Sequence, residues 1–421
     1  MCDTMVSRTQ DTGMFLFAKN SDRDPGEPQI IQYVEGREGL DEMSHPEHRD
    51  SYDKIQYRRL VEAAKGLTNP IRALISRPSW IWGAEMGVNE RGLAIGNEAV
   101  FARSRVDKQG LLGMDILRLA LHNAGNAREG VDFISRLLQE FGQGGNGSYA
   151  GTLRYHNSFL LADAEDAWVL ESAGKRWVAR QVGSVASISN AYSIGKDYHL
   201  ADEQTGKDST DFAALHASRL HLWFTKGEFR RERSRSMLEG NLADWETMAT
   251  ILRHNEGKPG SVDHSMRSIC MDATGFVKSR TASSMIVEYH DGVPLVWMTG
   301  APLPAYSPFL PFTVDDSACE TAPHADIRFA YRFARERLEL IEHILIAPQK
   351  ARERIAQVAI ETELRCRSMI LEAQKGMFAQ TAVAALAEEQ TFRNQVREVL
   401  VEFGAESKSL HEKPDSYYRC G

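Results

Sequence analysis

The residues best suited to chemistry stand at the start of the sequence. Cys2 follows Met1 directly, and a side chain this small at the second position permits removal of the initiator methionine. Cys2 would then carry a thiol and a free α-amine, whose reference pKa values are about 8.5 and about 8. Because the two values are close, the amine can take the thiol proton near neutral pH. We therefore expect trimming of Met1 to place a nucleophile and its base on one residue.

The residues after Cys2 predict a β-hairpin that would position it. Residues 4–8 alternate in character and residues 14–18 are apolar, as strands often are. Gly13, in the turn-like stretch between them, can adopt positive φ. The second strand would end in the polar run 19–23. Since the strands of a hairpin are antiparallel, this run would return beside Cys2.

The polar run 19–23 carries groups that a reactive thiol needs. Asp22 could hold the protonated α-amine, and Lys19 or Arg23 could favour the thiolate. The competing interpretation is that Cys2 is a buried small hydrophobe without a catalytic role, as free cysteines often are. The polar return beside Cys2 weighs against that interpretation.

Two blocks in the hairpin are characteristic: Cys-Asp-Thr at 2–4 and Phe-Ala-Lys-Asn-Ser-Asp-Arg at 17–23. They resemble the secernin family, the dipeptidase-type cysteine branch of the N-terminal nucleophile (Ntn) hydrolases. The resemblance continues in order through blocks at 77–87, 89–92, 96–100, 112–115, 142–146, 156–163, 168–171, 188–190, 269–271, 281–285 and 299–302. So many ordered blocks are a more specific signal than one short motif.

Strand-like segments flank helical pairs, which predicts an α+β architecture of stacked sheets covered by helices. The strand candidates are residues 29–34, 71–76, 93–95, 158–162, 167–172, 177–181, 185–189, 268–271, 283–289 and 295–298. We expect the segments from 158 to 189 to form one meander. Helical spacing predicts two helices within 111–141, and long amphipathic helices over 327–346, 351–373 and 378–403. The resemblance implies the four-layer αββα sandwich of Ntn hydrolases with a C-terminal helical extension.

The composition changes near the linker-like residues 315–323, which suggests two regions. Residues 2–316 would form the Ntn-hydrolase catalytic domain, with the polar and mostly helical segment 196–256 inserted over the site. Residues 317–421 would form a C-terminal helical region. This region could be an oligomerisation or capping module, or a helical layer on the catalytic domain. Apart from the strand 29–34, residues 25–65 are interpreted as a surface excursion.

Acyl transfer to a thiol creates an oxyanion, which needs preorganised donors. Asn97 is the candidate donor, because it would stand at the end of the strand 93–95 and its Gly-Asn-Glu-Ala-Val block matches the family. Asn190, in the matching Ile-Ser-Asn block, would support the amine or the oxyanion. Asp22 would fix the protonated amine, and Lys19 would supply positive charge near the thiolate. The related bile-salt and penicillin-amidase branch has Arg where Lys19 stands, so its substrate preferences are not carried over.

Four further residues are candidates for contact with the substrate. Trp80 and Trp82 could line a pocket or pack in the core, since aromatic side chains serve both uses. Glu98 belongs to the same block as Asn97, and Arg280 is a candidate for a second cationic position. For every polar candidate, a purely structural hydrogen bond is the competing interpretation.

Composition and charge exclude several classes of protein. The formal net charge of -8 argues against nonspecific nucleic-acid binding, and the basic run 230–235 is interpreted as a solvated helix face. No apolar run of about 18 residues and no signal-like start is present, so we expect no membrane span and a cytoplasmic location. The five cysteines are scattered, which argues against disulfides and structural zinc. His45 and His48 are interpreted as loop residues rather than metal ligands.

The Cys2 hairpin predicts an N-terminal cysteine nucleophile, and the resemblance implies a cysteine amidase or dipeptidase that needs no cofactor and no metal. The enzyme would cleave a C–N amide bond in a small peptide or related amide, through an acyl-thioester on Cys2. Two other functions stay open. The same thioester could pass its acyl group to an amine, which would make the protein an acyltransferase. Alternatively, the chain could be a non-catalytic regulatory protein of the secernin type. The C-terminal helices could mediate a homo-oligomer.

Overall fold

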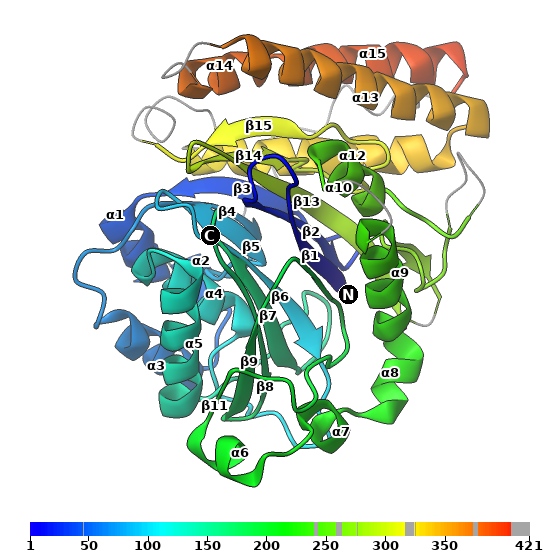
Figure 1. Ribbon diagram of the computed structural model, residues 1–421. Helices are drawn as coiled ribbons and strands as arrows, with labels where there is room; N and C mark the ends of the chain where they lie inside the picture. The colour runs from blue at the N-terminus through cyan, green and yellow to red at the C-terminus, as the bar shows by residue number, and fades with distance from the viewer. Residues whose placement is uncertain are drawn as a thin grey trace.

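The N-terminal hairpin lies within one of two β-sheets in the computed structural model (Figure 1). The structure describes residues 1–44, 46–239, 243–257, 263–275, 277–315, 324, 326–373 and 378–405. The hairpin consists of β1 (Cys2–Arg8) and β2 (Phe15–Arg23), with Cys2 opposite Ser21. Gly13 in its turn has a φ of 70°, which only glycine adopts readily. The predicted hairpin and its polar return beside Cys2 are confirmed.

The first sheet is antiparallel and contains seven strands of the described residues. Its order is β10 (Val185–Ile188), β1, β2, β13 (Lys278–His290), β14 (Val293–Met298) and β15 (Leu310–Thr313), while β12 (Asp272–Thr274) pairs with β13. The hairpin is therefore held on both sides, by β10 and by β13. This position fixes the backbone of Cys2 in the sheet interior.

The second sheet is antiparallel and contains eight strands of the described residues. Its order is β11 (Leu200–Ala201), β9 (Arg176–Gln181), β8 (Ala167–Ala173), β7 (His156–Ala162), β6 (Ala94–Val100), β5 (Met86–Asn89), β4 (Ala73–Pro78) and β3 (Gln29–Val34). Both faces of these strands are buried over most of their length. A sheet buried on both faces must lie inside a layered structure.

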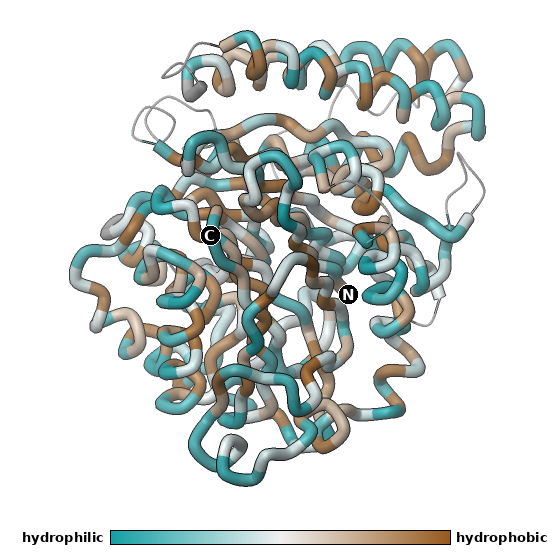
Figure 2. The backbone as a smooth tube through the Cα atoms, in the orientation of Figure 1, coloured by the Kyte–Doolittle hydropathy of each residue, from teal (hydrophilic) through white to brown (hydrophobic). Residues whose placement is uncertain are grey.

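Apolar side chains from the two sheets meet in one core, which includes Phe17, Met285, Leu74 and Leu160. The hydropathy colouring places hydrophobic residues along these inner strands (Figure 2). Helices α4 (Gly113–Asn123) and α5 (Ala127–Phe141) cover the second sheet, and α9 (Gly227–Glu239) and α10 (Trp245–Leu252) pack on the first. This layering confirms the predicted α+β fold and its αββα sandwich.

The insertion predicted over 196–256 is largely helical. It contains α6 (Glu203–Asp208), α7 (Phe212–His216), α8 (Arg219–Thr225), α9 and α10. In Figure 1 these helices run from the lower end of the second sheet to the side of the first sheet, beside the N-terminus. Helix α9 packs on β10 and β1. The insertion therefore reaches the strand that begins with Cys2.

The C-terminal region folds as α12 (Ile327–Ile346), α13 (Gln349–Glu372), α14 (Phe378–Ala385) and α15 (Glu388–Glu402). The last predicted helix, 378–403, is two helices in the structure. Helix α12 packs on β3 and α14 packs on β15, so this region lies on the sheets (Figure 1). The domain boundary at residue 316 and the homo-oligomer stay predictions.

Several sequence-based expectations differ from the structure. Residues 25–65 are not only a surface excursion, because they contain the short helices α1 (Gly36–Asp41), η1 (Glu42–Ser44) and α2 (Pro46–Arg49) and the helix α3 (Lys54–Ala64). Leu60 of α3 is buried against the second sheet's helices. The strand at 185–189 does not extend the meander, because β10 crosses to the first sheet and pairs with β1. None of the helices in the described ranges has the length and hydropathy needed to cross a bilayer.

Candidate active site

Cys2 lies at the start of β1, at the wall of a cavity of about 460 Å³. Its side chain is 5% exposed. Asp22 N donates to Cys2 Sγ over 3.4 Å, and the thiol lies 3.6 Å from Glu85 Oε2. The cavity is lined by Met1, Cys2, Asp22, Arg23, Asp24, Glu27, Glu85, Asn97, Ala99, Gly147, Ser148, Tyr149, Ala150, Thr152, Leu153, Tyr155, Val277, Lys278 and Ser279. The predicted nucleophile thus opens onto a space large enough for a small substrate.

Burial raises the pKa of the Cys2 thiol far above its ordinary value, although the Lys19 charge opposes this effect. A thiol in this state is protonated at neutral pH and is a weak nucleophile. The site therefore needs a base beside the sulfur. With Met1 attached, Cys2 N is an amide and cannot serve as that base.

Asn190 contacts the nitrogen atom of Cys2, as predicted for a residue that supports the amine. Its Oδ1 accepts from Cys2 N over 3.0 Å and from Arg230 Nη2 over 2.6 Å, and its Nδ2 donates to Ala99 O over 2.8 Å. Three hydrogen bonds fix the amide orientation. A freed α-amine would find an acceptor already in place.

Asp22 is buried next to the Cys2 sulfur. Its Oδ1 accepts from Thr281 Oγ1 over 2.6 Å, while no donor among the described residues reaches Oδ2. The backbones of Met1 and Asp22 also exchange two hydrogen bonds. An unpartnered carboxylate oxygen in the interior is costly, and an ammonium at Cys2 would relieve that cost.

Burial of Asp22 makes the stability of chains that retain Met1 depend on pH. Burial raises the pKa of the Asp22 carboxyl to about 7, whereas it is about 3.9 in an unfolded chain. The folded state therefore binds more protons between these values, and the free energy of unfolding falls as pH rises from about 4 to about 7. We expect Asp22→Asn to remove this contribution, which is worth a few kcal/mol.

Denaturant unfolding at about pH 5 and about pH 7.5 measures this effect. The wild-type chain should lose more stability between the two conditions than Asp22→Asn loses. Burial also raises the pKa values of Glu98 and Asp115, but both proteins carry these groups, so they cancel in the comparison. Equal losses in the two proteins would contradict the burial of an ionisable Asp22.

Lys19 is fully buried behind the nucleophile. Its Nζ donates to Asn97 O over 2.8 Å and to Glu98 Oε1 over 3.2 Å. Burial lowers its pKa, but the charges of Cys2, Glu98 and Glu85 outweigh burial and raise it. A Cβ at Gly96 would lie 2.5 Å from Lys19 Cδ, so this position must be glycine for the lysine to fit. Lys19 is thus a fixed positive charge near Cys2.

Glu98 is the partner of Lys19 rather than a residue of the cavity lining. It accepts from Thr4 Oγ1 and from Lys19 Nζ, and it is completely buried. Burial raises the pKa of its carboxyl to about 8, against the opposing charge of Lys19. The pair keeps the lysine in place beneath the site.

Asn97 lines the cavity from the second sheet. Its Nδ2 donates to Asn157 Oδ1 over 3.2 Å, and Asn157 is held in turn by Gln143 Oε1. The expectation that Asn97 stands at a strand end is wrong, because it lies in the middle of β6, opposite Phe159. A strand interior makes the side chain a rigid donor.

Two charged residues of the cavity lining, Arg23 and Glu85, lie in segments quoted for the family resemblance, but their contacts were not predicted. Arg23 forms ion pairs with Glu85, 2.9 Å apart, and with Glu27, 2.8 Å apart. Glu85 also accepts from Ser21 Oγ over 3.1 Å. The three charged side chains form one cluster, the Arg23–Glu85–Glu27 cluster, on the cavity wall beside Cys2.

Arg230 corrects the interpretation of the run 230–235 as a solvated helix face. Its side chain is 0% exposed, and its Nε lies 2.9 Å from Asp3 Oδ2. Its Nη2 reaches Asn190 Oδ1, and its Nη1 donates to Thr225 O. The buried stripe of α9, Gly227, Arg230, Ser234 and Leu238, follows helical spacing, and it was the one signal that could have identified this arginine.

The remaining substrate-contact candidates lie outside the cavity lining. Trp82 is 0% exposed in the core of the second sheet and its helices, and Arg118 stacks on its ring. Trp80 donates from Nε1 to Glu27 Oε1 over 2.7 Å. Arg280 forms ion pairs with Asp272 of β12 and with Glu342 of α12. Of these three, Trp80 is bonded to the Arg23–Glu85–Glu27 cluster.

The histidines and cysteines considered in the sequence analysis form no second candidate site within the described residues. Among the described residues, no group of three or more His, Cys, Asp or Glu side chains is arranged to hold a metal ion. Cys270 and Cys366 are buried free thiols. His48 is buried in the structure, whereas His45, Cys319 and Cys420 fall outside the described residues.

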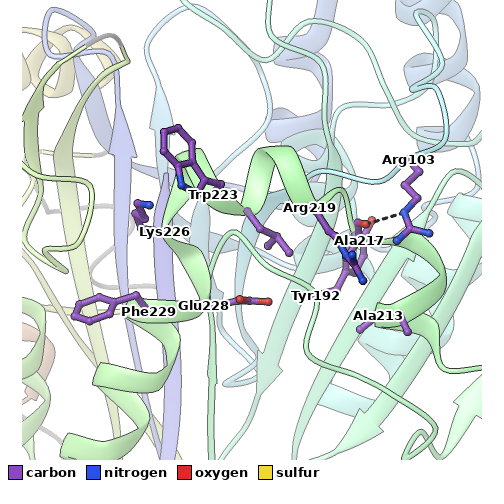
Figure 3. Close-up of a pocket in the computed structure, with 11 residues that line it drawn as sticks. Arg103, Tyr192, Ala213, Ala217, Arg219, Trp223, Lys226, Glu228 and Phe229 are labelled. Atoms are coloured by element: carbon purple, nitrogen blue, oxygen red, sulfur yellow. Dashed lines mark hydrogen bonds between the residues drawn. The ribbon is translucent and has the colours of Figure 1, made fainter.

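A second hollow, of about 630 Å³, lies between the insertion helices and the second sheet (Figure 3). Its described lining contains three basic side chains, Arg103, Arg219 and Lys226, together with Glu228 and mostly apolar or aromatic residues. Arg103 is bonded to Ala217 O there. This lining contains no thiol or hydroxyl nucleophile other than the Tyr192 phenol, whose oxygen donates to Ser172 O. The chemistry therefore points to the Cys2 cavity.

The sequence of this chain matches known proteins over part of its length. Residues 80–231 match the sequence model of peptidase family C69. The chain is 27% identical over 203 residues to probable dipeptidase A of Streptococcus pyogenes serotype M3 (strain SSI-1), which is 46% of this chain and 38% of that protein. The same protein of serotype M1 matches equally, with 37% of its length covered. The chain thus spans less than half the length of these relatives.

Solved structures with a similar arrangement include penicillin V acylase from Agrobacterium tumefaciens, with 14% identity, a TM-score of 0.39, and coverage of 74% of this chain and 86% of that one. The C2A mutant of conjugated bile acid hydrolase from Clostridium perfringens has 11% identity and a TM-score of 0.40, and covers 71% and 88%. The sequence matches to family C69 and to probable dipeptidase A support the resemblance to the secernin family. Residues 80–231 of this chain are thus similar in sequence to peptidase family C69.

Proposed function

We propose that this protein is a cysteine amidohydrolase of the dipeptidase type, which cleaves a C–N amide bond in small peptides or related amides. The observation that carries the proposal is the placement of both reactive atoms of Cys2. Its sulfur opens onto the cavity beside Asp22, and its nitrogen is held by Asn190 Oδ1. The match to family C69 and to dipeptidase A supports the same reaction class.

The proposal needs a break in the chain between Met1 and Cys2. The freed α-amine takes the proton of the thiol, and the thiolate attacks the substrate carbonyl carbon. A C–S bond forms, and the carbonyl π electrons move to the oxygen. Asn97 Nδ2 donates to this oxyanion, and the Lys19 charge lies nearby. The intermediate collapses, the C–N bond breaks, and the Cys2 ammonium gives its proton to the leaving amine.

Water completes the cycle. The α-amine, neutral again, takes a proton from a water molecule as the water oxygen attacks the thioester carbon. A second oxyanion forms and collapses, the C–S bond breaks, and the Cys2 sulfur recovers a proton from the ammonium. The products are a carboxylic acid and an amine. Asp22 stabilises the ammonium in both halves, since its Oδ2 has no other donor among the described residues.

The test combines mass, labelling and turnover. Intact mass should show loss of Met1 in active protein, and active chains that all retain Met1 would rule the mechanism out. A thiol-directed electrophile should label Cys2 and stop hydrolysis of a dipeptide panel. Unlabelled Cys2 with no turnover would instead favour a non-catalytic role. Product analysis with and without added amines separates hydrolysis from acyl transfer.

Asn97→Ala is expected to lower turnover by roughly a hundredfold or more, because one oxyanion donor is worth about that factor. The measurement is kcat on a cleaved dipeptide, with the melting temperature as a check of the fold. Asn157→Ala is the companion variant. It leaves the donor in place but removes its partner, so a smaller fall is expected. Wild-type turnover in Asn97→Ala would remove this residue from the site.

A further inference from the structure

We propose that Glu85 binds the free α-ammonium of the substrate and that this contact sets the preference of the enzyme for unblocked dipeptides and amino-acid amides over N-acyl compounds. This inference rests on the proposed function and names the residue that determines its specificity. It assigns the Arg23–Glu85–Glu27 cluster a role in specificity. Three observations carry it: the position of Glu85, the charge of the cluster and the burial of both.

The position of Glu85 matches the position of an α-ammonium in the reactive complex. Its Oε2 lies 3.6 Å from Cys2 Sγ on the cavity wall. The attacking sulfur must come within about 3 to 3.5 Å of the scissile carbon. In an aminoacyl substrate the ammonium nitrogen is two bonds from that carbon, at about 2.5 Å. An ammonium attached there falls within hydrogen-bond reach of a carboxylate placed like Glu85.

The charge of the cluster leaves one negative charge for a ligand. Arg23 is shared by two carboxylates, Glu85 at 2.9 Å and Glu27 at 2.8 Å, so the three side chains sum to one negative charge. The other buried charged groups around Cys2 have partners outside the cluster. Lys19 is bonded to Glu98, Arg230 pairs with Asp3, and Asp22 awaits the Cys2 ammonium in the processed enzyme.

Burial makes this excess charge consequential. The side chains of Glu27 and Glu85 are 1% and 3% exposed, and that of Arg23 is 8% exposed. A buried charge without a full counter-charge carries a large desolvation cost, and a cation of the ligand removes it. The hydrogen bonds from Trp80 Nε1 to Glu27 and from Ser21 Oγ to Glu85 fix both carboxylates but bring no charge.

An N-acyl substrate offers no such cation. Its neutral amide would leave the cluster charge uncompensated, and it would place an acyl group against a carboxylate. A site built around a charged donor discriminates strongly against an analogue that lacks it, because its own polar groups are then left unpaired. The cluster therefore selects for a free amino terminus at the residue whose carbonyl is attacked.

The experiment compares alanyl-alanine with propionyl-alanine, the same molecule without its amine. In the processed wild-type enzyme, kcat/KM for alanyl-alanine should exceed that for propionyl-alanine by about a hundredfold or more. Glu85→Gln should lose most of this preference, mainly through a higher KM for alanyl-alanine. The charge of Glu85 also acts on the Cys2 thiol, but this effect is common to both substrates and cancels in the ratio of their kcat/KM values.

Asp24→Asn is the matched control. Asp24 also lines the cavity, but it is partly exposed, and the backbone N–H of Gly26 donates to it. We expect the preference of this variant to stay within about threefold of wild type. If Asp24→Asn loses as much preference as Glu85→Gln, general negative potential rather than Glu85 selects the substrate, and the assignment is overturned.

A second readout does not depend on turnover. Cationic 2-aminoethyl methanethiosulfonate and neutral methyl methanethiosulfonate both modify thiols, and the ratio of their rates reports the potential at Cys2 Sγ. The ratio should fall about tenfold or more in Glu85→Gln. An unchanged ratio, or equal loss on both dipeptide analogues, overturns the ammonium site. If the wild type cleaves no amide but the ratio of the two modification rates still changes in Glu85→Gln, the proposed function is overturned instead.

Discussion

A chain with a non-cleavable Gly-Ser extension ahead of Cys2 is expected to show no amide turnover. The extension converts the α-amine of Cys2 into an amide, which has no usable basicity near pH 7. Burial raises the pKa of the Cys2 thiol, so thiolate formation depends on a base beside it. The described lining of the cavity contains no histidine to replace that base.

The extension should leave the fold intact. In the structure, where Met1 precedes Cys2, the amide of Cys2 donates to Asn190 Oδ1 and the hairpin register is complete. We therefore expect a melting temperature within a few degrees of the processed enzyme. Cys2→Ser is the informative comparison, since it keeps the amine but offers a hydroxyl that is harder to deprotonate, so slow turnover is expected. Full activity in an extended chain of confirmed mass would contradict the N-terminal nucleophile.

The parts of the site that sequence reasoning located are local in the chain. Cys2 and the run 19–23 are joined by a single tight turn, and their strands pair directly, so the alternation of residues was enough to predict their meeting. Asn190 follows β10 and was found through the family resemblance. Its contact with Cys2 N spans 188 residues, and no local pattern predicts a contact that long.

The parts that sequence reasoning missed depend on contacts between distant segments. Glu85 directly precedes β5 of the second sheet and meets Arg23 of the first, because the two sheets face each other there. Strand β10 looked like a fourth strand of the meander, yet it pairs with β1. Strand order is set by packing between layers, and hydrophobic alternation alone does not encode which sheet a strand joins.

Arg230 shows the same limit in a helix. A run of arginines in a polar helix normally faces solvent, and Arg233 and Arg235 do so, with ion pairs to Glu256 and Glu239. Only the packing of α9 on β1 and β10 turns Arg230 inward, onto Asp3 and Asn190. The same helix therefore carries exposed charges that contribute little to the stability of the fold and a buried charge that contributes much.

Arg230→Met is expected to destabilise the fold by roughly 3 to 5 kcal/mol, the cost of breaking a buried ion pair by removal of one partner. The substitution leaves Asp3, which is 0% exposed, with an unpaired charge. It also removes the donor that fixes Asn190 Oδ1 against Cys2 N. We therefore expect a large fall in turnover, even at temperatures where the variant is folded.

Two variants separate these contributions, with denaturant unfolding and kcat as the measurements. Arg235→Ala, on the exposed face of the same helix, should change stability by no more than about 0.5 kcal/mol. Asp3→Asn combined with Arg230→Met removes both charges, so it should recover much of the lost stability. It should not recover turnover, because Asn190 still lacks its guanidinium donor. If the double variant regains both, Arg230 serves only to neutralise Asp3, and the orientation of Asn190 toward Cys2 does not depend on the inserted helix.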